Sequence, residues 1–526
     1  MASGNYDYVI VGAGSAGCVL ANRLTEDSRI TVLLLEAGGP DDEANIRIPA
    51  AFSKLFKTQY DWTYYTEAQP RLKNRRLYWP RGKTLGGSSA INAMIYIRGH
   101  RCDYDHWHRL GNAGWSFEEV LPYFKKAEDQ ERGASEYHAT GGPLRVADLR
   151  FVNPLSHAFV EAAQQAGYRW NSDFNGAEQE GVGCYQVTQK HGRRQSAADA
   201  YLKPALGRRN LTVRTHAHAT RVVFKGARAA GVAYVQFGRP QEVRATREVI
   251  LSGGTINSPQ LLMLSGIGPA DHLRALGLPV VADLPGVGQN LQDHLIIAVA
   301  YECTRPVSMA GAEKLGNLLR YVLFRRGMLT SNVAEAGGFA KTRPDLPAPD
   351  LQFIFGPLFY LSHGFSGPEG HGYSIGPTLI RPQSRGSVTL RSGDPFEPPA
   401  IQPNYFSSDA DLRVLIEGIK LGRRIGDAKA FDSFRGVEVY PGPAAQSDES
   451  IADYISSVAE TLYHPVGTCK MGSDAMAVVD ARLRVRGVEG LRVADASIMP
   501  TVIGGNTNAP TVMIAEKAAD LIKEEA

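Results

Sequence analysis

Residues 6–36, YDYVIVGAGSAGCVLANRLTEDSRITVLLLE, decide the fold of the amino-terminal part of the chain. The continuous apolar runs at residues 8–11 and 30–35 are typical of parallel strands that are buried on both faces. The glycine-rich segment between them predicts a tight turn that leads into a helix. The stretch is therefore predicted to form strand, turn, helix and strand in succession.

The turn carries a GxGxxG pattern formed by Gly12, Gly14 and Gly17. The first glycine allows the tight turn, the second lets the backbone approach a pyrophosphate, and the third lets the helix pack on the strand. The helix amino terminus then faces the phosphates with its partial positive charge. Glu36 ends the second strand nineteen residues after Gly17, where a carboxylate can accept hydrogen bonds from ribose hydroxyls. Together these features predict one dinucleotide site, because no second such pattern follows downstream; which dinucleotide binds stays open.

The composition is that of an ordinary enzyme. A chain of 526 residues is long for one hydrophobic core, so two domains or one large composite fold are expected. The 55 glycines and 30 prolines never form a long uninterrupted stretch, which favours ordered loops over disorder. The net charge of +3 is weak and dispersed, and this argues against a nucleic-acid-binding protein.

The cysteines and the amino terminus indicate a cytoplasmic protein. The five cysteines are odd in number, widely spaced and without a metal-binding pattern, so free thiols and no metal site are expected. The amino terminus lacks the basic region of a secretory signal, and no apolar run approaches the length of a membrane span. Residues 314–327, KLGNLLRYVLFRRG, predict a basic amphipathic helix. Such a helix either docks on anionic lipid or, more commonly, forms a solvated surface, so peripheral membrane contact stays open.

Other patterns predict the remaining architecture. Residues 218–237 alternate like a β-hairpin, and residues 246–268 are typical of a buried strand, a Gly-Gly turn and a helix. Residues 301–463 change character. The segments DLQFIFG, GYSIGPTLI and GSVTLR favour an antiparallel sheet, which the helix-like residues 409–425 are expected to cover on one side.

Two longer motifs resemble the signatures of one enzyme family. Residues 82–105, GKTLGGSSAINAMIYIRGHRCDYD, and residues 254–268, GTINSPQLLMLSGIG, resemble the two signatures of the glucose-methanol-choline (GMC) family of FAD-dependent oxidoreductases. With the amino-terminal fingerprint and the carboxy-terminal HPVGT and GGNTNAP segments, the resemblance covers essentially the whole chain. Within the family the chain resembles choline dehydrogenases and related FAD-dependent alcohol dehydrogenases.

The resemblance implies an α/β fold of two discontinuous domains. A Rossmann-like FAD-binding domain with a parallel sheet is expected from residues 1–153, 205–300 and 464–526. An α+β substrate domain, built on an antiparallel sheet with helices on one side, is expected from residues 154–204 and 301–463. The second domain is expected to cover the flavin.

The resemblance also implies the FAD contacts. They are Gly12, Gly14, Ser15, Ala16, Gly17, Glu36, Ala37, Trp62, Gly87, Ser88, Asn92, Ala93, Met94, Ile95, Val222, Tyr463, Asp495, Ala496, Asn506 and Asn508. Adjacent glycines in GGSSAIN let the main chain pass close to a flat ring. Some choline-oxidising members attach the flavin covalently through a histidine in this loop. The matching position here is Ile91, so noncovalent FAD is expected.

The resemblance implies that His464 is the catalytic base and that Asn506, in GGNTNAP, is its partner. A flavin that accepts hydride from an alcohol needs the hydroxyl proton removed, and a neutral imidazole serves near physiological pH. The Asn506 amide can orient the alcohol oxygen without adding a second titrating group. Asn508 is expected to cap the last helix, whose amino terminus would face the flavin.

The substrate side is less defined. Leu462 and Tyr463 are expected to shape the pocket beside the base. Glu335 matches a position that faces the trimethylammonium group in choline-oxidising relatives, yet relatives that oxidise uncharged alcohols share it, so choline is one candidate among several. Residues 362–372 form either a mobile lid or an ordinary surface loop.

These features predict oxidation of a primary alcohol to an aldehyde by hydride transfer to FAD, with a quinone or similar electron acceptor. An oxidase that uses dioxygen and releases hydrogen peroxide is the first alternative. A lyase or light-driven decarboxylase on the same fold is the alternative of another class, and a noncatalytic FAD-binding protein is the third.

Overall fold

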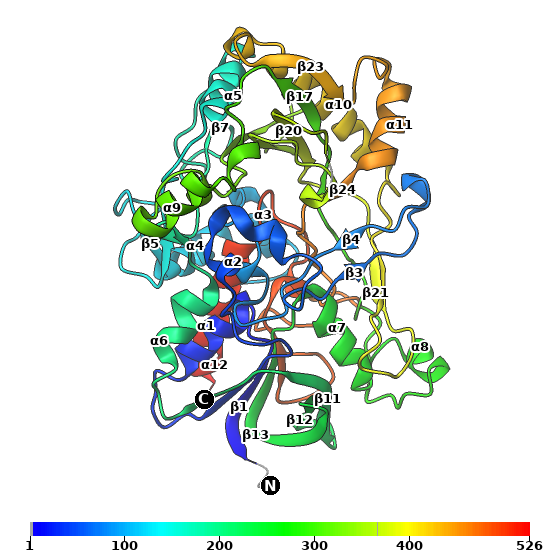
Figure 1. The fold of residues 1–526 in the computed structure, drawn as a ribbon. Coiled ribbons are helices and arrows are strands. Elements are labelled where there is room, and N and C mark those ends of the chain that lie inside the picture. Colours follow the sequence, from blue (N-terminus) through cyan, green and yellow to red (C-terminus); the bar gives the residue numbers. More distant parts are fainter. Residues whose placement is uncertain (1–3, 366, 526) are drawn as a thin grey trace.

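A computed structural model describes residues 4–365 and 367–525, and it contains two large sheets stacked along the molecule (Figure 1). The first sheet lies near both chain termini and has seven strands in the order β10-β2-β1-β13-β12-β11, with β25 also paired to β13. Its strands are β1 (Asn5–Val11), β2 (Val32–Leu35), β10 (Leu211–Arg214), β11 (Ala217–Lys225), β12 (Arg228–Gln236), β13 (Arg239–Leu251) and β25 (Leu491–Val493).

Most pairings in this sheet are parallel, as the apolar runs predicted. Strands β10, β2, β1, β13 and β25 pair in parallel, whereas β11 and β12 form the predicted antiparallel hairpin. All four residues of β2 are buried, and it begins two residues later than the apolar run suggested. Strand β13, a Gly-Gly turn and helix α7 (Gly254–Leu264) confirm the second strand-turn-helix prediction.

The second sheet is antiparallel and has eight strands, in the order β23-β17-β20-β19-β18-β7, with β16 paired to both β20 and β24. Its strands are β7 (Gly181–Cys184), β16 (Leu295–Ile296), β17 (Val299–Cys303), β18 (Ala336–Ala340), β19 (Leu351–Gly356), β20 (Gly372–Leu379), β23 (Arg435–Tyr440) and β24 (Glu460–Thr461). Helices α5 (Pro154–Gln165) and α10 (Asp409–Gly426) pack against it, as Figure 1 shows at the top of the molecule. The α/β fold class with a separate antiparallel layer is therefore confirmed.

One predicted strand lies elsewhere. The GSVTLR segment forms β21 (Ser387–Thr389), which pairs only with β22 (Ala400–Gln402) in a separate two-stranded sheet. The prediction that it joins the large sheet was wrong, because alternation reports a half-buried strand but not its partner. The two-domain division stays a proposal. Its predicted boundary at residue 300 falls inside β17, and β16 already belongs to the second sheet.

The remaining elements are short or lie between the sheets. The helices are α1 (Ser15–Leu24), α2 (Ala44–Arg47), α3 (Arg101–Arg109), α4 (Phe117–Ala127), α6 (Lys203–Ala205), α8 (Ala270–Ala275), α9 (Leu315–Phe324), α11 (Asp448–Val458) and α12 (Asn508–Glu524). The paired short strands are β3 (Tyr64–Tyr65) with β4 (Tyr78–Trp79), β5 (Glu128–Gln130) with β6 (Leu144–Val146), β8 (Gln189–Lys190) with β9 (Arg193–Arg194), and β14 (Ile267–Gly268) with β15 (Ala282–Asp283).

Each sheet has its own hydrophobic core. Val9, Leu33 and Ile250 lie in the core around the first sheet, and Tyr373 and Phe431 stack with ring centroids 4.6 Å apart in the core of the second. No helix among the described residues is long and apolar enough to cross a bilayer.

Candidate active site

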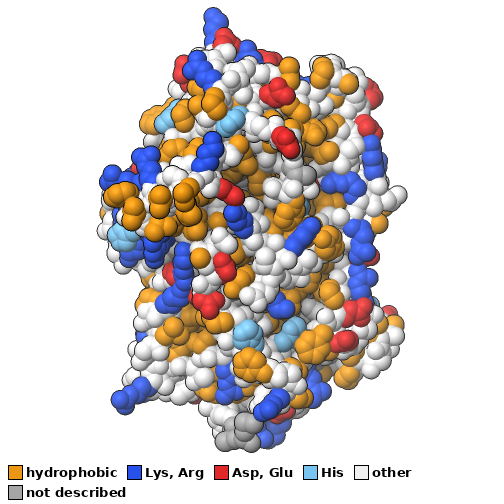
Figure 2. Space-filling model, viewed as in Figure 1, with side chains coloured by type: hydrophobic (Ala, Val, Ile, Leu, Met, Phe, Trp, Pro, Cys, Tyr) orange, Lys and Arg blue, Asp and Glu red, His pale blue; other side chains and the backbone are white. Residues whose placement is uncertain are grey.

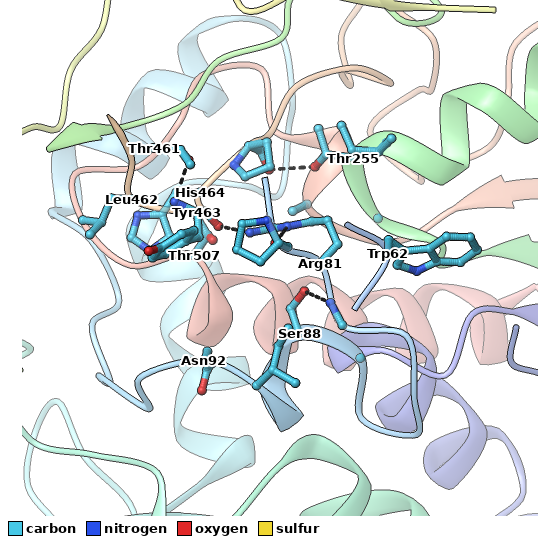
Figure 3. Close-up of a pocket in the computed structure, with 18 of the residues that line it drawn as sticks. Trp62, Arg81, Ser88, Asn92, Thr255, Thr461, Leu462, Tyr463, His464 and Thr507 are labelled. Atoms are coloured by element: carbon cyan, nitrogen blue, oxygen red, sulfur yellow. Dashed lines mark hydrogen bonds between the residues drawn. The ribbon is translucent and has the colours of Figure 1, made fainter. Parts of the chain in front are cut away.

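A cavity of about 780 Å³ lies between the two sheets (Figure 3). Its wall includes the glycine turn after β1 and, from the antiparallel sheet, Ile296, Ile354 and Gly376. It brings together most of the predicted site residues. They are Gly12, Gly14, Ser15, Ala16, Glu36, Ala37, Trp62, Gly87, Ser88, Asn92, Ala93, Met94, Ile95, Leu462, Tyr463, His464, Asp495, Ala496, Asn506 and Asn508.

The three glycines of the fingerprint have different surroundings. Gly12 has a φ of +99°, which favours glycine. A Cβ on Gly17 would lie 1.8 Å from the carbonyl oxygen of Gly12, so this position holds α1 against the turn. A Cβ on Gly14 would meet no protein atom within 4 Å, and Gly14 lines the cavity. The turn therefore leaves bare backbone where a phosphate group can approach.

Glu36 lies at the end of β2, inside the cavity wall. Its two carboxylate oxygens accept hydrogen bonds from the backbone N–H groups of Ala13 and Gly38, both at 2.8 Å. Burial raises the pKa of Glu36 to about 7. A carboxylate held at this point suits the hydroxyls of a nucleotide ribose, and with the open Gly14 position it fits the adenosine diphosphate half of FAD.

The GGSSAIN loop packs directly against the glycine turn. Gly87 has a φ of +51°, and a Cβ there would lie 2.7 Å from the Cα of Gly14. Figure 3 shows Ser88 and Asn92 on one side of the cavity, and Trp62 lies at the opposite end of the view from His464. Ile91 also lines the cavity.

The last helix joins this end of the site. Asn508 is the first residue of α12 and its side-chain oxygen accepts a hydrogen bond from Oγ of Ser15 at 2.7 Å. The predicted capping role of Asn508 was wrong, because Thr507 is the cap residue and makes no side-chain cap hydrogen bond. Asp495 accepts hydrogen bonds from the backbone N–H of Gly254 and from Oγ of Ser258.

His464 is buried and its ring is held on both nitrogens. Nε2 lies 3.2 Å from the amide nitrogen of Asn506, and Nδ1 lies 3.0 Å from Nδ1 of His294. The backbone N–H of His464 donates to the carboxylate of Asp293 at 2.9 Å. The predicted pair of His464 and Asn506 therefore meets at the cavity, and His294 is an additional contact.

A chain of hydrogen bonds fixes which nitrogen of His464 carries the proton. The Tyr185 hydroxyl donates to the backbone oxygen of Phe353, so it accepts from Nε2 of Gln352 at 3.2 Å. The same Gln352 nitrogen donates to the Asn506 side-chain oxygen at 3.1 Å, which turns the Asn506 nitrogen toward His464. Nε2 of His464 therefore accepts the hydrogen bond from the Asn506 amide, and the ring proton of His464 is on Nδ1.

The surroundings keep His464 neutral. Burial, then the neighbouring His294, then the Arg81 guanidinium lower the pKa of His464 well below its usual 6.5. Burial likewise lowers the pKa of His294 to about 3. The Nδ1 of neutral His294 accepts the hydrogen bond that the Nδ1–H of His464 donates. Arg81 donates to the backbone oxygen of Tyr463 at 2.6 Å, which places its charge beside the base (Figure 3).

Aromatic side chains form the wall beside the base. The Tyr463 hydroxyl lies 3.1 Å from that of Tyr360 and 2.8 Å from Nδ1 of His363, and Phe56 packs against the Tyr463 ring. His363 belongs to the predicted loop at residues 362–372, in which Ser366 lies outside the described residues. Ser362 and Gly367 of this loop line the cavity.

Three predicted residues do not line the cavity. Gly17 faces the backbone of the glycine turn at Gly12 instead of the cavity. Val222 lies on β11, where its backbone N–H donates to Oγ of Ser265. Ala217, His218 and Ala219 line the cavity from the same strand as Val222.

Glu335 is the third, and it differs most from its predicted role. It is fully buried, and its carboxylate accepts hydrogen bonds from the hydroxyls of Ser331 and Ser156 and from the backbone N–H of Asn153. These contacts tie it to the start of α5 instead of directing it toward a ligand. Burial raises the pKa of Glu335, and no lysine or arginine of the described residues pairs with its carboxylate.

Sequence reasoning missed Arg81, Asp293, His294 and Gln352. Asp293 and His294 are adjacent in residues 284–295, LPGVGQNLQDHL, a segment that also resembles the family, and this resemblance was the available signal. Nothing local distinguishes Gln352, which lies in an apolar strand.

A dinucleotide cradle that faces a neutral, oriented histidine defines the class: an oxidoreductase that binds one dinucleotide and removes hydride and proton from its substrate. The sequence profile of the GMC oxidoreductase family matches residues 6–296 and 382–515. The chain belongs to this family of FAD-dependent oxidoreductases, which act on CH–OH groups.

Characterised relatives share nearly the whole length. The chain is 50% identical to an alcohol dehydrogenase [acceptor] of Pseudomonas putida, over 98% of this chain and 95% of the relative. It is also 50% identical to the mitochondrial choline dehydrogenase of Homo sapiens, over 98% and 90%. The crystal structure of pyridoxine 4-oxidase from Mesorbium loti superimposes with a TM-score of 0.91 at 35% identity, covering 98% of this chain and 99% of the other. A formate oxidase of Aspergillus oryzae superimposes with a TM-score of 0.93 at 29% identity, covering 100% and 99%.

Proposed function

We propose that this protein oxidises an uncharged primary alcohol to an aldehyde, with His464 as the base and Asn506 as the group that orients the hydroxyl. The observation that carries the proposal is the hydrogen-bond chain that leaves Nε2 of His464 unprotonated at the cavity. FAD held by the glycine turn and the GGSSAIN loop would supply the acceptor for the hydride. We propose that it is held noncovalently, because Ile91 stands where a covalently attaching histidine would be.

His464 and Asn506 act together on the alcohol hydroxyl. The alcohol hydroxyl donates to Nε2 of His464 and accepts from the Asn506 amide, and this replaces their direct contact. His464 takes the hydroxyl proton, because the negative charge left on oxygen makes hydride departure from carbon easier. The bond from Nδ1 of His464 to His294 holds the ring in place throughout. The aromatic wall around Tyr463 keeps water away from the base.

The charge of the cavity wall favours an uncharged substrate over choline. Among the described residues, the carboxylates that line the cavity are Glu36, Glu460 and Asp495. Glu36 and Asp495 bond backbone groups, and Glu460 lies 3.4 Å from His363 and 3.9 Å from Arg75. None of them is a free partner for a trimethylammonium group, and Glu335 is engaged elsewhere. The relatives at 50% identity include both an alcohol dehydrogenase and a choline dehydrogenase, so the choice rests on the charge of the cavity wall.

For the electron acceptor we propose a quinone or similar carrier, with dioxygen as the alternative. The alcohol dehydrogenase relative is named for an acceptor, whereas pyridoxine 4-oxidase and formate oxidase are named as oxidases.

The test is anaerobic mixing of the yellow holoenzyme with a panel of alcohols that contains matched aliphatic chains, benzyl alcohol and choline. We expect uncharged primary alcohols to bleach the flavin absorbance faster than choline. Slow recolouring in air and fast recolouring with a quinone analogue support the dehydrogenase; immediate recolouring with peroxide release supports the oxidase. A flavin that no alcohol bleaches contradicts the proposal.

A further inference from the structure

Helix α9 presents an apolar surface to solvent. Five aliphatic side chains on it, which we call the α9 ridge, are exposed. They are Leu315 (69%), Leu318 (42%), Leu319 (50%), Val322 (53%) and Leu323 (67%). Single exposed apolar residues are common on protein surfaces. A contiguous exposed apolar patch is unusual and marks an interaction site. Figure 2 shows hydrophobic side chains gathered on the flank of the molecule where Figure 1 places α9.

The α9 ridge points away from the protein. Its members follow the spacing i, i+3, i+4, i+7 and i+8, which defines one face of a helix. The opposite face carries Asn317 and Tyr321, which bond the backbone oxygens of Gly311 at 2.9 Å and Arg47 at 3.2 Å. Tyr321 is buried with Met309, Ala312 and Leu329 and holds this face of the helix against the protein, so the α9 ridge is left facing solvent.

Basic side chains surround the ridge. Residues 311–327 carry four cationic residues, Lys314, Arg320, Arg325 and Arg326, against one carboxylate, Glu313. That carboxylate pairs with a lysine of the neighbouring 3₁₀ turn at 2.7 Å.

The β8–β9 hairpin extends the basic surface. Its turn residue Gly192 packs against the backbone of Arg325, since a Cβ there would meet the Arg325 oxygen at 2.7 Å. The exposed Lys190 and Arg193 of the hairpin thus lie near the end of α9. Figure 2 shows lysine and arginine side chains around the apolar patch.

We propose that α9 docks this enzyme on an anionic phospholipid surface, with the α9 ridge inserted among the acyl chains and the flanking cations at the headgroups. Aliphatic side chains framed by arginine and lysine have this complementarity to a lipid interface. A protein partner with a matching groove would bury the ridge equally well, but the clustered positive charge favours an anionic membrane.

Two short turns connect the docking surface on α9 to one wall of the cavity. Helix α9 contacts the 3₁₀ turn Met328–Thr330, which contacts the 3₁₀ turn Pro49–Leu55. Phe52, in the latter turn, lines the cavity. A docked bilayer therefore sits near one wall of the cavity, where a membrane-dissolved alcohol or acceptor would be concentrated.

The test is flotation of the FAD-loaded enzyme with vesicles of phosphatidylcholine, with or without phosphatidylglycerol, in the absence of alcohol and acceptor. We expect binding to the anionic vesicles that weakens with salt. The Leu319→Ser/Leu323→Ser variant should bind on the order of tenfold more weakly. Arg320→Gln/Arg326→Gln should weaken binding about fivefold per charge and reduce the salt dependence.

The matched control is Phe237→Ser/Val437→Ser, which removes two apolar side chains that are 75% and 63% exposed outside α9. It should bind as the parent does. No binding to anionic vesicles, equal binding of all variants, or a ridge-dependent dimer in light scattering without vesicle binding overturns the proposal. Flavin bleaching by alcohols, measured separately on the same variants, shows whether the proposed activity stands independently of docking.

Discussion

The two ends of the cavity are held together by different physical means. At the nucleotide end, the glycine turn packs backbone against backbone within itself and against the GGSSAIN loop, and Gly17 and Gly87 leave no room for a side chain. At the histidine end, side chains from distant segments meet through hydrogen bonds, as His294 and His464 do across 170 residues. Steric fit thus governs the first end and proton placement the second, so substitutions should fail differently at each.

The largest effect is expected at the nucleotide end. In Gly17→Ala the new Cβ would lie 1.8 Å from a backbone oxygen, so α1 must move, at a cost of at least about 3 kcal/mol. We expect colourless, poorly folded protein. Gly14→Ala should keep its fold but lose FAD affinity, because its Cβ meets no protein atom. Circular dichroism and flavin absorbance of the purified variants separate these outcomes, with Gly207→Ala as the open-space control. If Gly17→Ala and Gly14→Ala lose fold and flavin to the same extent, steric fit does not explain the nucleotide end.

Next in size is loss of the base. His464→Ala should keep its yellow colour and melting temperature near the parent's, while flavin reduction by alcohol slows about 10²- to 10⁴-fold. Rapid-mixing measurement of flavin bleaching checks this. Reduction at the parental rate would remove His464 from the mechanism and leave the histidine end without a function.

The nucleotide end of the cavity could be predicted from the sequence more fully than the histidine end. The glycine turn and Glu36 were predictable because a local pattern encodes a local backbone shape, and the position of His464 came from a long motif. The partnership of His464 with His294 and Gln352 was not, since no local pattern reports which distant side chains meet in a core. Glu335 shows the limit most plainly, because the motif placed it at the substrate whereas Ser156, Ser331 and Asn153 engage its carboxylate.

The pH dependence of activity sharpens the description of the histidine end. Only neutral His464 accepts a proton, and burial lowers its pKa well below 6.5. We therefore expect kcat/KM to stay constant as the pH falls to about 6.5 and beyond. Once the pH drops below the pKa of His464, kcat/KM should fall about tenfold per pH unit. The sign for stability is the same. The unfolded chain binds a proton more readily than the folded one below about pH 6.5, so stability declines as pH falls. A rate profile from stopped-flow reduction with a midpoint above 6.5 would contradict this.

A smaller effect is expected from His294, which acts through His464 as a positioning residue. His294→Leu leaves the Nδ1–H of His464 buried without an acceptor, which frees the proton to move to Nε2. We expect kcat to fall on the order of tenfold, with an unchanged flavin spectrum. His294→Asn places an oxygen where Nδ1 was and should restore most of the rate. If both variants lose activity equally, His294 serves packing alone.

The smallest effect on activity is expected at Glu335. Because its carboxylate bonds Ser156, Ser331 and the Asn153 backbone, Glu335→Gln should destabilise the fold by about 1–3 kcal/mol yet change the ratio of kcat/KM for choline and 1-butanol by less than about twofold. Phe56→Ala, in the cavity wall, should instead change the preference between short and long alcohols. Thermal melts, and steady-state rates with choline, 1-butanol and a longer primary alcohol, measure stability and substrate preference. A choline-specific loss in Glu335→Gln would return this carboxylate to the substrate site and make the cationic alcohol the better candidate.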